Sequence, residues 1–290
     1  MGNLSDKNRG HLGMKPDDKR IWEKIDKNDD RWRKRRKKKE DFQTVDSVID
    51  LNTVKRLRKL QDKGFIDSIS GTIASGKESG IFLAKLGSEG EEYCKALSIV
   101  SPIVIKIYRT STLNFKKIIR YIDGDIRFRK HSKRTRHIVN LWAEKEYKNL
   151  QRSSIAKVRV PTPILVKNNI LLMELLGKKS RPFPLLKNSP QAYTEETLAQ
   201  IIEQTKMLFN KAGLVHADLS PFNILIGDQI PYFIDMSQSV LVSHPKALEF
   251  LERDIDNVIS FFFMKGIEVP DSKEIFNTIT KDFPDKDLLT

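Results

Sequence analysis

The stretch LVHADLSPFNIL, residues 214–225, decides how the rest of the chain is interpreted. From His216 to Asn223 it has the spacing H-x-D-L-x-x-x-N, and Asp235 follows twelve residues later, after the apolar run YFI. Asp and Asn are common in turns at strand ends, so Asp218 or Asp235 alone would carry little information. The full spacing, followed by a strand that ends in Asp, is too specific for that explanation.

Phosphoryl transfer accounts for this grouping. One carboxylate accepts or orients the proton of the attacking hydroxyl, while an amide and a second carboxylate hold Mg²⁺ against a triphosphate. The spacing matches the catalytic loop of protein kinases. It therefore predicts that Asp218 is the catalytic base and that Asn223 and Asp235 are metal ligands.

Two upstream residues complete such a site. Protein kinases hold the α- and β-phosphates with a strand lysine, which a helical carboxylate positions. Lys106 is the one charge in the β-branched run IVIKIY, residues 103–108. A helix is expected from about Ile138 to Gln151, and at about 100° per residue Glu146 lies beside its apolar stripe, whereas Glu144 faces solvent. Glu146 is therefore the predicted partner of Lys106.

The string SGKES, residues 75–79, is the candidate phosphate-binding turn. It is neither G-x-G-x-x-G nor a Walker A motif, because Glu78 stands where Walker A has a hydroxyl and because the turn lies between strands. Small side chains, hydroxyls and a positive charge still suit phosphate oxygens. The residues predicted to hold the phosphates are Ser75, Gly76, Lys77 and Ser79.

Hydrophobic periodicity predicts an α+β fold in two lobes, with strands dominating the front of the chain and helices the back. Gly64 and Gly213 are expected to end helices, and Thr194 to begin one as its N-cap. The expected helices span residues 45–63, about 138–151, 194–213 and 248–262. The expected strands include residues 103–108, 170–173, 214–216, 224–226 and 232–234.

The composition excludes several classes of protein. The chain has 290 residues, of which 39% are hydrophobic and 31% charged, which is globular but shifted toward charge. No apolar run approaches the roughly 20 residues of a membrane helix, and the N-terminus lacks the apolar core of a secretory signal. Cys94 is the only cysteine, so an internal disulfide and a cysteine-based metal cluster are both excluded. A reducing, cytoplasmic location is expected.

The net charge of +14 belongs to two segments. Residues 1–40 carry 15 Lys/Arg against 8 Asp/Glu, and residues 109–140 carry 10 against 2, so the remainder is nearly neutral. In residues 31–39 eight of nine side chains are basic, which predicts a solvated, disordered arm. Such an arm also suits contacts with RNA phosphates, and Trp32 can stack on a base. A localisation signal is the competing interpretation.

Several strings together resemble the RIO family of atypical protein kinases: SGKES, VIKIY, WAEKEY, LVHADLSPFNIL and YFIDMSQSV. The segments TSTLNFKKIIRYIDGDIRF and IDMSQSV are more similar to the Rio-one than to the Rio-two subfamily, and no winged-helix domain is apparent at the N-terminus. The resemblance covers about residues 43–265. It implies a bilobal kinase fold, use of ATP with Mg²⁺ or Mn²⁺, serine autophosphorylation, and a role in maturation of the small ribosomal subunit.

The resemblance also implies which residues bind each part of ATP. Lys106 and the Asp218, Asn223 and Asp235 set keep the roles given above, and the SGKES turn covers the phosphates. The adenine base is expected to lie against a hinge made of Met173, Glu174 and Leu176.

The implied domains are a basic, disordered arm at 1–41, an N-lobe at 42–176 and a reduced C-lobe at 177–290. The N-lobe includes a basic, flexible segment at 109–140. Besides ATP, the expected partner is a pre-small-ribosomal-subunit particle or its rRNA, contacted through residues 31–39 and 109–140.

The metal loop departs from the pattern of ordinary protein kinases. It reads DMS from Asp235 where they have D-F-G, so the Phe switch is missing, and no A-P-E follows. Only 55 residues remain after Asp235. An activation loop and a full peptide-binding C-lobe do not both fit, and recognition of an extended protein substrate is not expected.

Three other functions remain open. Small-molecule kinases of the aminoglycoside or choline type share the loop spacing, but they show HGDLHPGN-like strings and need an acidic C-lobe, whereas Ser220 replaces the His here and the charge is positive. An ATPase-type ribosome assembly factor would use ATP as a conformational clamp, with Asp235 transiently accepting the γ-phosphate as an acyl phosphate. A catalytically dead RNA-binding module would leave the Lys/Asp/Asn/Asp set unexplained.

Overall fold

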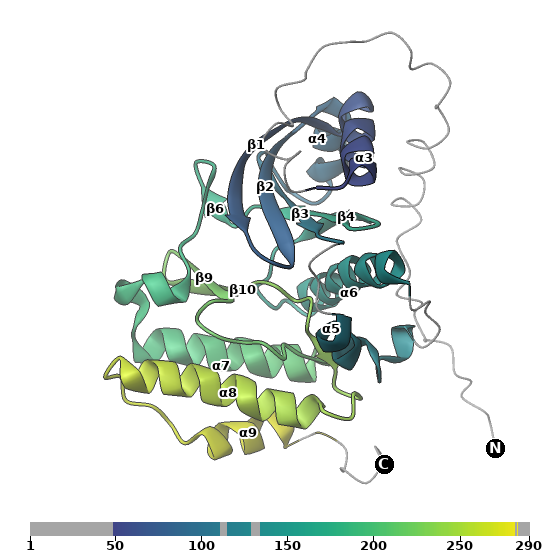
Figure 1. Ribbon diagram of the computed structural model, residues 1–290. Coiled ribbons are helices and arrows are strands. Elements are labelled where there is room, and N and C mark those ends of the chain that lie inside the picture. The colour runs from purple at the N-terminus through teal and green to yellow at the C-terminus, as the bar shows by residue number, and fades with distance from the viewer. Residues whose placement is uncertain (1–48, 111–114, 129–133, 282, 284–290) are drawn as a thin grey trace, which may run out of the picture. The chain divides into compact units, whose positions relative to one another are not determined.

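The computed structural model describes residues 49–110, 115–128, 134–281 and 283, so the predicted arm at 1–41 lies outside it. In the described part the predicted α+β fold is confirmed: an antiparallel sheet is followed by a largely helical region (Figure 1). The helices are α3 (Leu51–Asp62), α4 (Ser88–Lys95), α5 (Phe115–Ile122), α6 (Thr135–Ile155), α7 (Glu195–Asn210), α8 (Ala247–Met264) and α9 (Ser272–Thr280).

Strands form one large sheet and three small ones. Those of the large sheet are β1 (Ile66–Ser75), β2 (Ser79–Leu86), β3 (Ile103–Tyr108), β4 (Pro163–Lys167) and β5 (Ile170–Glu174). The short strands are β6 (Gly177–Lys178), β7 (Arg181–Pro182), β8 (Leu214–Val215), β9 (Ile224–Gly227), β10 (Ile230–Phe233) and β11 (Val240–Leu241). Three 3-10 turns complete the list: η2 (Ile126–Phe128), η3 (Leu186–Asn188) and η4 (Pro190–Ala192).

The large sheet has the order β1-β2-β3-β5-β4 and is antiparallel throughout. Strand β3 lies at its centre, bonded to β2 on one side and to β5 on the other, and all six of its residues are buried. Helix α6 packs against β4 and β5. Lys106 therefore lies buried in the central strand of the sheet. A lysine on an edge strand could instead keep its charge in solvent.

The helix predicted over residues 45–63 is present as α3, which begins at Leu51; residues 45–48 lie outside the described ranges. The Asp50 carboxylate accepts hydrogen bonds from the backbone N–H groups of Asn52 (3.0 Å) and Thr53 (3.2 Å), which is the arrangement of an N-cap. Asp50 itself has an extended backbone, so the described helix cannot extend before it.

Part of the segment 109–140, predicted to be flexible, is folded. Helix α5 and turn η2 bury four apolar side chains, namely Ile118, Tyr121, Ile122 and Phe128. The Tyr121 ring lies 6.1 Å from that of Trp142 on α6 and 5.5 Å from that of Phe250 on α8. The apolar residues recur at helical spacing between the cations, so this stretch is an amphipathic brace between two helices. Residues 111–114 and 129–133 lie outside the described ranges.

Helices α7, α8 and α9 pack on one another and form the helical half of the described chain (Figure 1). Thr194 caps α7 as predicted, because its hydroxyl accepts a hydrogen bond from Thr197 N at 3.2 Å. The short sheets β8–β11 and β9–β10 lie above these helices and carry the loops of the candidate site. Among the described residues, no helix combines the length and the apolar character needed to span a bilayer.

Candidate active site

Two carboxylates from distant segments of the chain meet at Lys106. Its Nζ donates to Glu146 Oε1 on α6 at 2.8 Å and to Asp235 Oδ1 at 3.0 Å. Lys106 and Glu146 are 4% and 1% exposed, whereas the Asp235 side chain is 42% exposed. Glu144 instead pairs with Lys148 on the helix surface. The Glu146 pairing expected from the helix geometry is therefore present.

The charges of Lys106 and Asp235 stabilise each other. Burial would lower the pKa of Lys106, but Asp235 and Glu146 outweigh it and raise that pKa above its ordinary value. Burial would raise the pKa of Asp235, yet Lys106 and the Ser237 hydroxyl, which donates at 2.7 Å, lower it to about 2. At neutral pH the site thus holds an ammonium beside an ionised carboxylate.

Glu146 has the opposite tendency. Burial raises the pKa of its carboxyl to about 7, Lys106 opposes that rise, and the nearby Asp235 charge adds to it. The Tyr108 hydroxyl donates to Glu146 Oε2, so both carboxyl oxygens are engaged.

Glu146 is expected to set an acid limit on activity. As pH falls through about 7 the carboxyl takes up a proton and loses its ion pair with the Lys106 ammonium, so ATP turnover should fall. Glu146→Gln cannot titrate; we expect turnover about 10- to 100-fold lower, the worth of a charged hydrogen bond, without this acid limb. Turnover of both proteins from about pH 5 to about pH 9 tests this. An unchanged acid limb in Glu146→Gln would assign it to another group.

The catalytic loop takes its shape from α8. Ala217, the residue before Asp218, has a positive φ of 65°, a conformation that L-residues adopt only when their surroundings impose it. The Asp254 carboxylate accepts from Ala217 N at 2.7 Å and from Leu219 N at 2.9 Å, and Arg253 donates to the Ala217 carbonyl. Sequence reasoning missed Asp254, although its polar side chain interrupts the buried face of α8.

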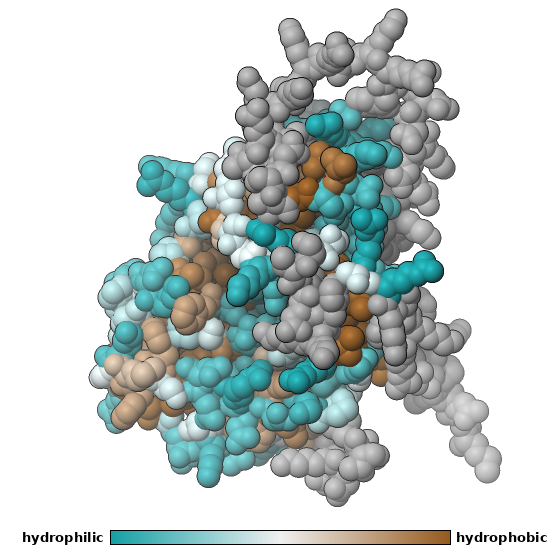
Figure 2. Space-filling view, viewed as in Figure 1, coloured by the Kyte–Doolittle hydropathy of each residue, from teal (hydrophilic) through white to brown (hydrophobic). Residues whose placement is uncertain are grey.

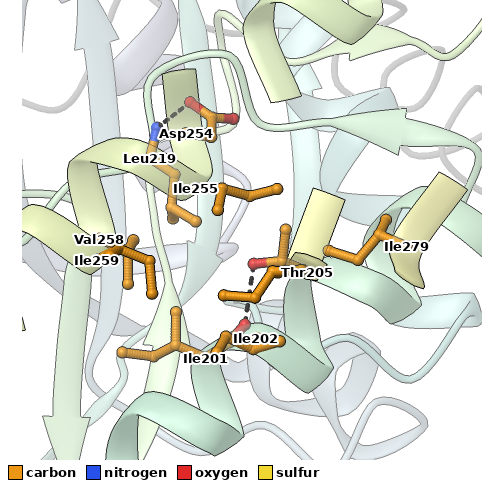
Figure 3. A pocket seen from close by; sticks show the side chains of 10 residues that line it. Ile201, Ile202, Thr205, Leu219, Asp254, Ile255, Val258, Ile259 and Ile279 are labelled. Carbon is orange, nitrogen blue, oxygen red and sulfur yellow. Dashed lines mark hydrogen bonds between the residues drawn. The ribbon is translucent and has the colours of Figure 1, made fainter. Parts of the chain in front are cut away.

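Asp254 also borders a small apolar pocket below the loop (Figure 3). The pocket lies between α7, α8 and α9, and its other lining residues are apolar except Thr205. It therefore belongs to the packing of the helical core and is separate from the predicted phosphate and metal residues.

Asp218 is held by two amides. Gln238 Nε2 donates to Asp218 Oδ2 at 2.8 Å, and Asn223 Nδ2 donates to the same oxygen at 3.3 Å and to the Asp218 carbonyl at 2.8 Å. These bonds fix the carboxylate while it remains an acceptor, as a base requires. Gln238 lies in the string IDMSQSV, but no role was predicted for it, because it stands outside the H-x-D-L-x-x-x-N spacing.

The β9–β10 hairpin brings the two predicted metal ligands together. Ile224 pairs with Phe233, and Ile234 N donates to the Asn223 carbonyl at 3.0 Å, which places Asp235 directly beyond Asn223. Asp235 has a φ of 60°, so the chain turns sharply there.

The donor set at this hairpin suits Mg²⁺. Asn223 uses its amide nitrogen on Asp218, which leaves its amide oxygen for a cation, beside the Asp235 carboxylate. In the described residues no three His, Cys, Asp or Glu side chains gather into a metal cage. Mg²⁺ commonly takes only one or two protein carboxylates together with substrate phosphates, so the pair fits that ion better than a permanent metal.

His216 supports the metal loop from behind. Burial lowers the pKa of His216 to about 4, so the ring is neutral at physiological pH. Its Nε2 lies 3.1 Å from the Ile234 carbonyl, which makes this nitrogen the protonated donor, and its ring meets Phe233 edge to face at 6.0 Å. His216 is thus a positioning residue for the strand that leads to Asp235.

Helix α6 also fixes the metal loop, through residues that the sequence did not reveal. Asn149 Nδ2 donates to the carbonyls of Met236 (2.8 Å) and Ser239 (2.9 Å). The buried Lys145 Nζ donates to the carbonyls of Ser237 (3.0 Å) and Ser239. Burial, reinforced by a nearby arginine, lowers the pKa of Lys145 well below its ordinary value. The helix that carries Glu146 is therefore bonded to the loop that carries Asp235.

The predicted phosphate turn closes the β1–β2 hairpin. Ser75 ends β1 and Ser79 begins β2, with Gly76 N donating to the Ser79 carbonyl at 2.9 Å and Lys77 exposed at the tip. Arg109, which sequence reasoning missed, donates from its guanidinium to Ser75 Oγ at 2.6 Å and from its backbone to the Glu78 carbonyl at 2.9 Å. Arg109 is thus a positive charge at the turn, directly after the strand of Lys106.

The predicted hinge lies where β5 ends. Met173 and Glu174 are the last residues of β5, and the Glu174 carboxylate accepts from Thr162 N at 3.1 Å. The Leu176 carbonyl accepts from Phe183 N at 2.9 Å, which starts the next hairpin. The Glu174 side chain is therefore used to hold the strands.

Comparison with known protein families finds one whose domain matches more than half of the chain. Residues 87–275 match the RIO domain, a range that includes Lys106, Glu146, the catalytic loop and the metal loop but not the SGKES turn. Two solved structures of the Rio2 kinase from Chaetomium thermophilum share the fold. One, a complex with ADP/Mg²⁺ and phosphoaspartate, has a TM-score of 0.53 at 23% identity over 78% of this chain and 66% of that chain.

Curated relatives are similar over most of the chain. A probable serine/threonine-protein kinase RIO1 homolog of Encephalitozoon cuniculi is 38% identical over 85% of this chain and 67% of its own length. The human serine/threonine-protein kinase RIO1 is 39% identical over 84% of this chain but only 42% of its own length. The RIO-type serine/threonine-protein kinase Rio1 of Haloferax volcanii is 34% identical over 91% of this chain and 86% of its own length.

Proposed function

Since this chain belongs to the RIO family of atypical protein kinases, we propose that it is an ATP- and Mg²⁺-dependent serine/threonine protein kinase that also phosphorylates itself. The observation that carries the proposal is the Lys106–Glu146–Asp235 contact, two buried groups and one accessible carboxylate, beside the held Asp218. An ion pair that only stabilised the fold would not need a carboxylate that a ligand can reach.

Each residue then has a definite task. Lys106 presents a permanent positive charge to phosphate oxygens, and Glu146 holds it there. Asp218 accepts the proton of the attacking hydroxyl. Asn223 and Asp235 would hold Mg²⁺, which neutralises charge on the phosphates when bound.

We propose further that the kinase acts in maturation of the small ribosomal subunit in the cytoplasm. It would contact rRNA or the pre-ribosomal particle through residues 31–39 and 109–140. Charge supports this: in the described part of the second segment Arg120, Arg134 and Arg136 are exposed. Cations on a surface bind RNA phosphates without sequence preference.

A second candidate, an ATPase-type assembly factor, is favoured by one observation. Asp235 is ionised, partly exposed and next to the phosphate-binding lysine, as a nucleophile requires. An Asp235 oxygen would attack the γ-phosphorus, the bond to the β-bridging oxygen would break, and ADP would leave; water would then hydrolyse the acyl phosphate. The solved Rio2 relative described as a phosphoaspartate complex adds support.

Following the γ-phosphate of radiolabelled ATP tests the proposal. Label on the protein that survives mild alkali, in which an acyl phosphate is hydrolysed, supports a serine/threonine kinase. Base-labile, acid-stable label that disappears in Asp235→Asn, with phosphate released to solution, supports the ATPase. Neither transfer nor hydrolysis would contradict both and favour an RNA-binding module.

A further inference from the structure

An exposed aromatic ring stands inside the catalytic loop. Phe222 is 61% exposed, although it lies between the predicted base Asp218 and the predicted metal ligand Asn223. The loop is tightly turned there, because Asn223 N donates to the Ser220 carbonyl at 2.9 Å. Loops carry a disproportionate share of binding and catalytic residues, so an apolar ring exposed on the catalytic loop is a candidate contact for another molecule.

A lysine from another segment covers this ring. Lys187 Nζ lies 4.2 Å from the centroid of Phe222, within the range of a cation–π contact. The two residues are fixed relative to each other, because Lys187 N donates to the Pro221 carbonyl at 3.2 Å and Leu185 forms a bridge with Leu225. The loop therefore presents an aromatic ring together with the ammonium that lies over one face of it.

The same segment adds more positive charge. Residues 177–188 contain four Lys/Arg and no Asp or Glu. Lys178 pairs with Asp228 at 2.6 Å, which leaves the exposed Lys179 and Arg181 of the β6–β7 hairpin as the cations for a ligand. Hydrophilic side chains cover this hairpin in Figure 2, beside the strands labelled β9 and β10 in Figure 1.

The hairpin is fixed to the strands of the site. The Phe183 ring stacks on Tyr232 of β10 at 5.9 Å, and it packs so closely on Gly227 that a Cβ there would lie 2.3 Å from it. The basic hairpin therefore keeps a constant position relative to Asn223 and Asp235.

We propose that Phe222, Lys187 and this hairpin form the site that recognises the phosphoacceptor, and that the acceptor is a serine or threonine flanked by an apolar and an acidic side chain. The inference rests on the proposed kinase function and names its substrate class. The apolar side chain packs on Phe222 and the carboxylate pairs with Lys187 and the hairpin cations. A short local contact of this kind does not need an extended peptide groove.

A protein acceptor fits this position better than RNA. Phe222 adjoins the residues expected to hold the transferred phosphate, so its ligand is the molecule that receives the phosphate. A serine or threonine hydroxyl is the acceptor that the proposed reaction uses.

Position-scanning serine peptide libraries, with Asp/Glu, Lys/Arg or Leu fixed at each flanking position, test the site on the full chain. Wild type should prefer the acidic over the basic peptides by about fivefold or more at one position or more, the scale of one to two exposed charge pairs. Lys187→Glu should reverse that preference. Phe222→Ala should lose the preference for Leu.

Lys206→Glu, the same charge change on an exposed lysine of α7, is the matched control and should select peptides as wild type does. If Lys206→Glu and Lys187→Glu changed peptide selection equally, or if wild type showed no preference for acidic peptides, the inference would be overturned. The proposed kinase function would not be affected. Weaker binding of single-stranded RNA by Lys187→Glu with unchanged peptide selection would overturn it in favour of a nucleic-acid surface. ADP binding without phosphorylation of any peptide or of the chain itself would remove the kinase function as well.

Discussion

Asp218→Ala is expected to lower γ-phosphate turnover by about 10²- to 10⁴-fold, the usual contribution of a general base. Its carboxylate is held by Gln238 and Asn223, whereas Lys106 is held by Glu146 and Asp235, so the nucleotide contacts should survive. Turnover with radiolabelled ATP and ADP affinity by calorimetry, measured on the same preparations, separate chemistry from binding.

Asp256→Ala is the matched control, because Asp256 is an exposed aspartate on α8. It should leave both quantities near the wild-type values. Equal losses of ADP affinity and turnover in Asp218→Ala would assign this residue a structural role and would contradict its place as the base.

Asp254→Asn is expected to lower the free energy of unfolding by about 2–4 kcal/mol, although asparagine has nearly the same shape. The two carboxylate oxygens of Asp254 accept from the N–H groups of Ala217 and Leu219. Asparagine has one acceptor oxygen, and its NH₂ would face the second N–H, so a buried donor loses its partner. Ala217 would also lose support for its positive φ.

Thermal unfolding at about pH 8 measures this effect. Burial raises the pKa of Asp254 to about 7, so there its carboxyl is mostly ionised. The melting temperature should fall by roughly 5–15 °C, from about 2–4 °C per kcal/mol in a domain of this size. Asp256→Asn, on the exposed side of the same helix, should melt like wild type. A wild-type melting temperature in Asp254→Asn would show that the loop does not depend on this carboxylate.

Local patterns were sufficient to predict which charged groups meet in the candidate site. Lys106 lies alone in an apolar strand, and helical spacing distinguished Glu146 from Glu144, because burial follows the 3.6-residue period. The strand pattern also placed Asp235 at the end of an apolar strand, and in the structure it closely follows β10, which ends at Phe233.

The supporting groups could not be predicted in the same way. Lys145 and Asn149 act on a loop about ninety residues later, and Asp254 acts on one thirty-five residues earlier, so only the folded chain brings them together. Asp254 did leave a signal, a carboxylate on the apolar stripe of Leu251, Ile255 and Val258. In α5 the opposite occurred, since the surplus of cations concealed the apolar residues that fold it.

The four hydrogen bonds from Lys145 and Asn149 to the metal loop have a consequence for inhibitor design. A compound that wedges between a regulatory helix and this loop needs the two to separate. Here separation would leave the buried Lys145 nitrogen and the Asn149 amide without partners, at a cost of about 1–3 kcal/mol for each unpaired donor. A compound that binds the predicted nucleotide site avoids this cost, and Arg109 beside the SGKES turn is a contact for it there.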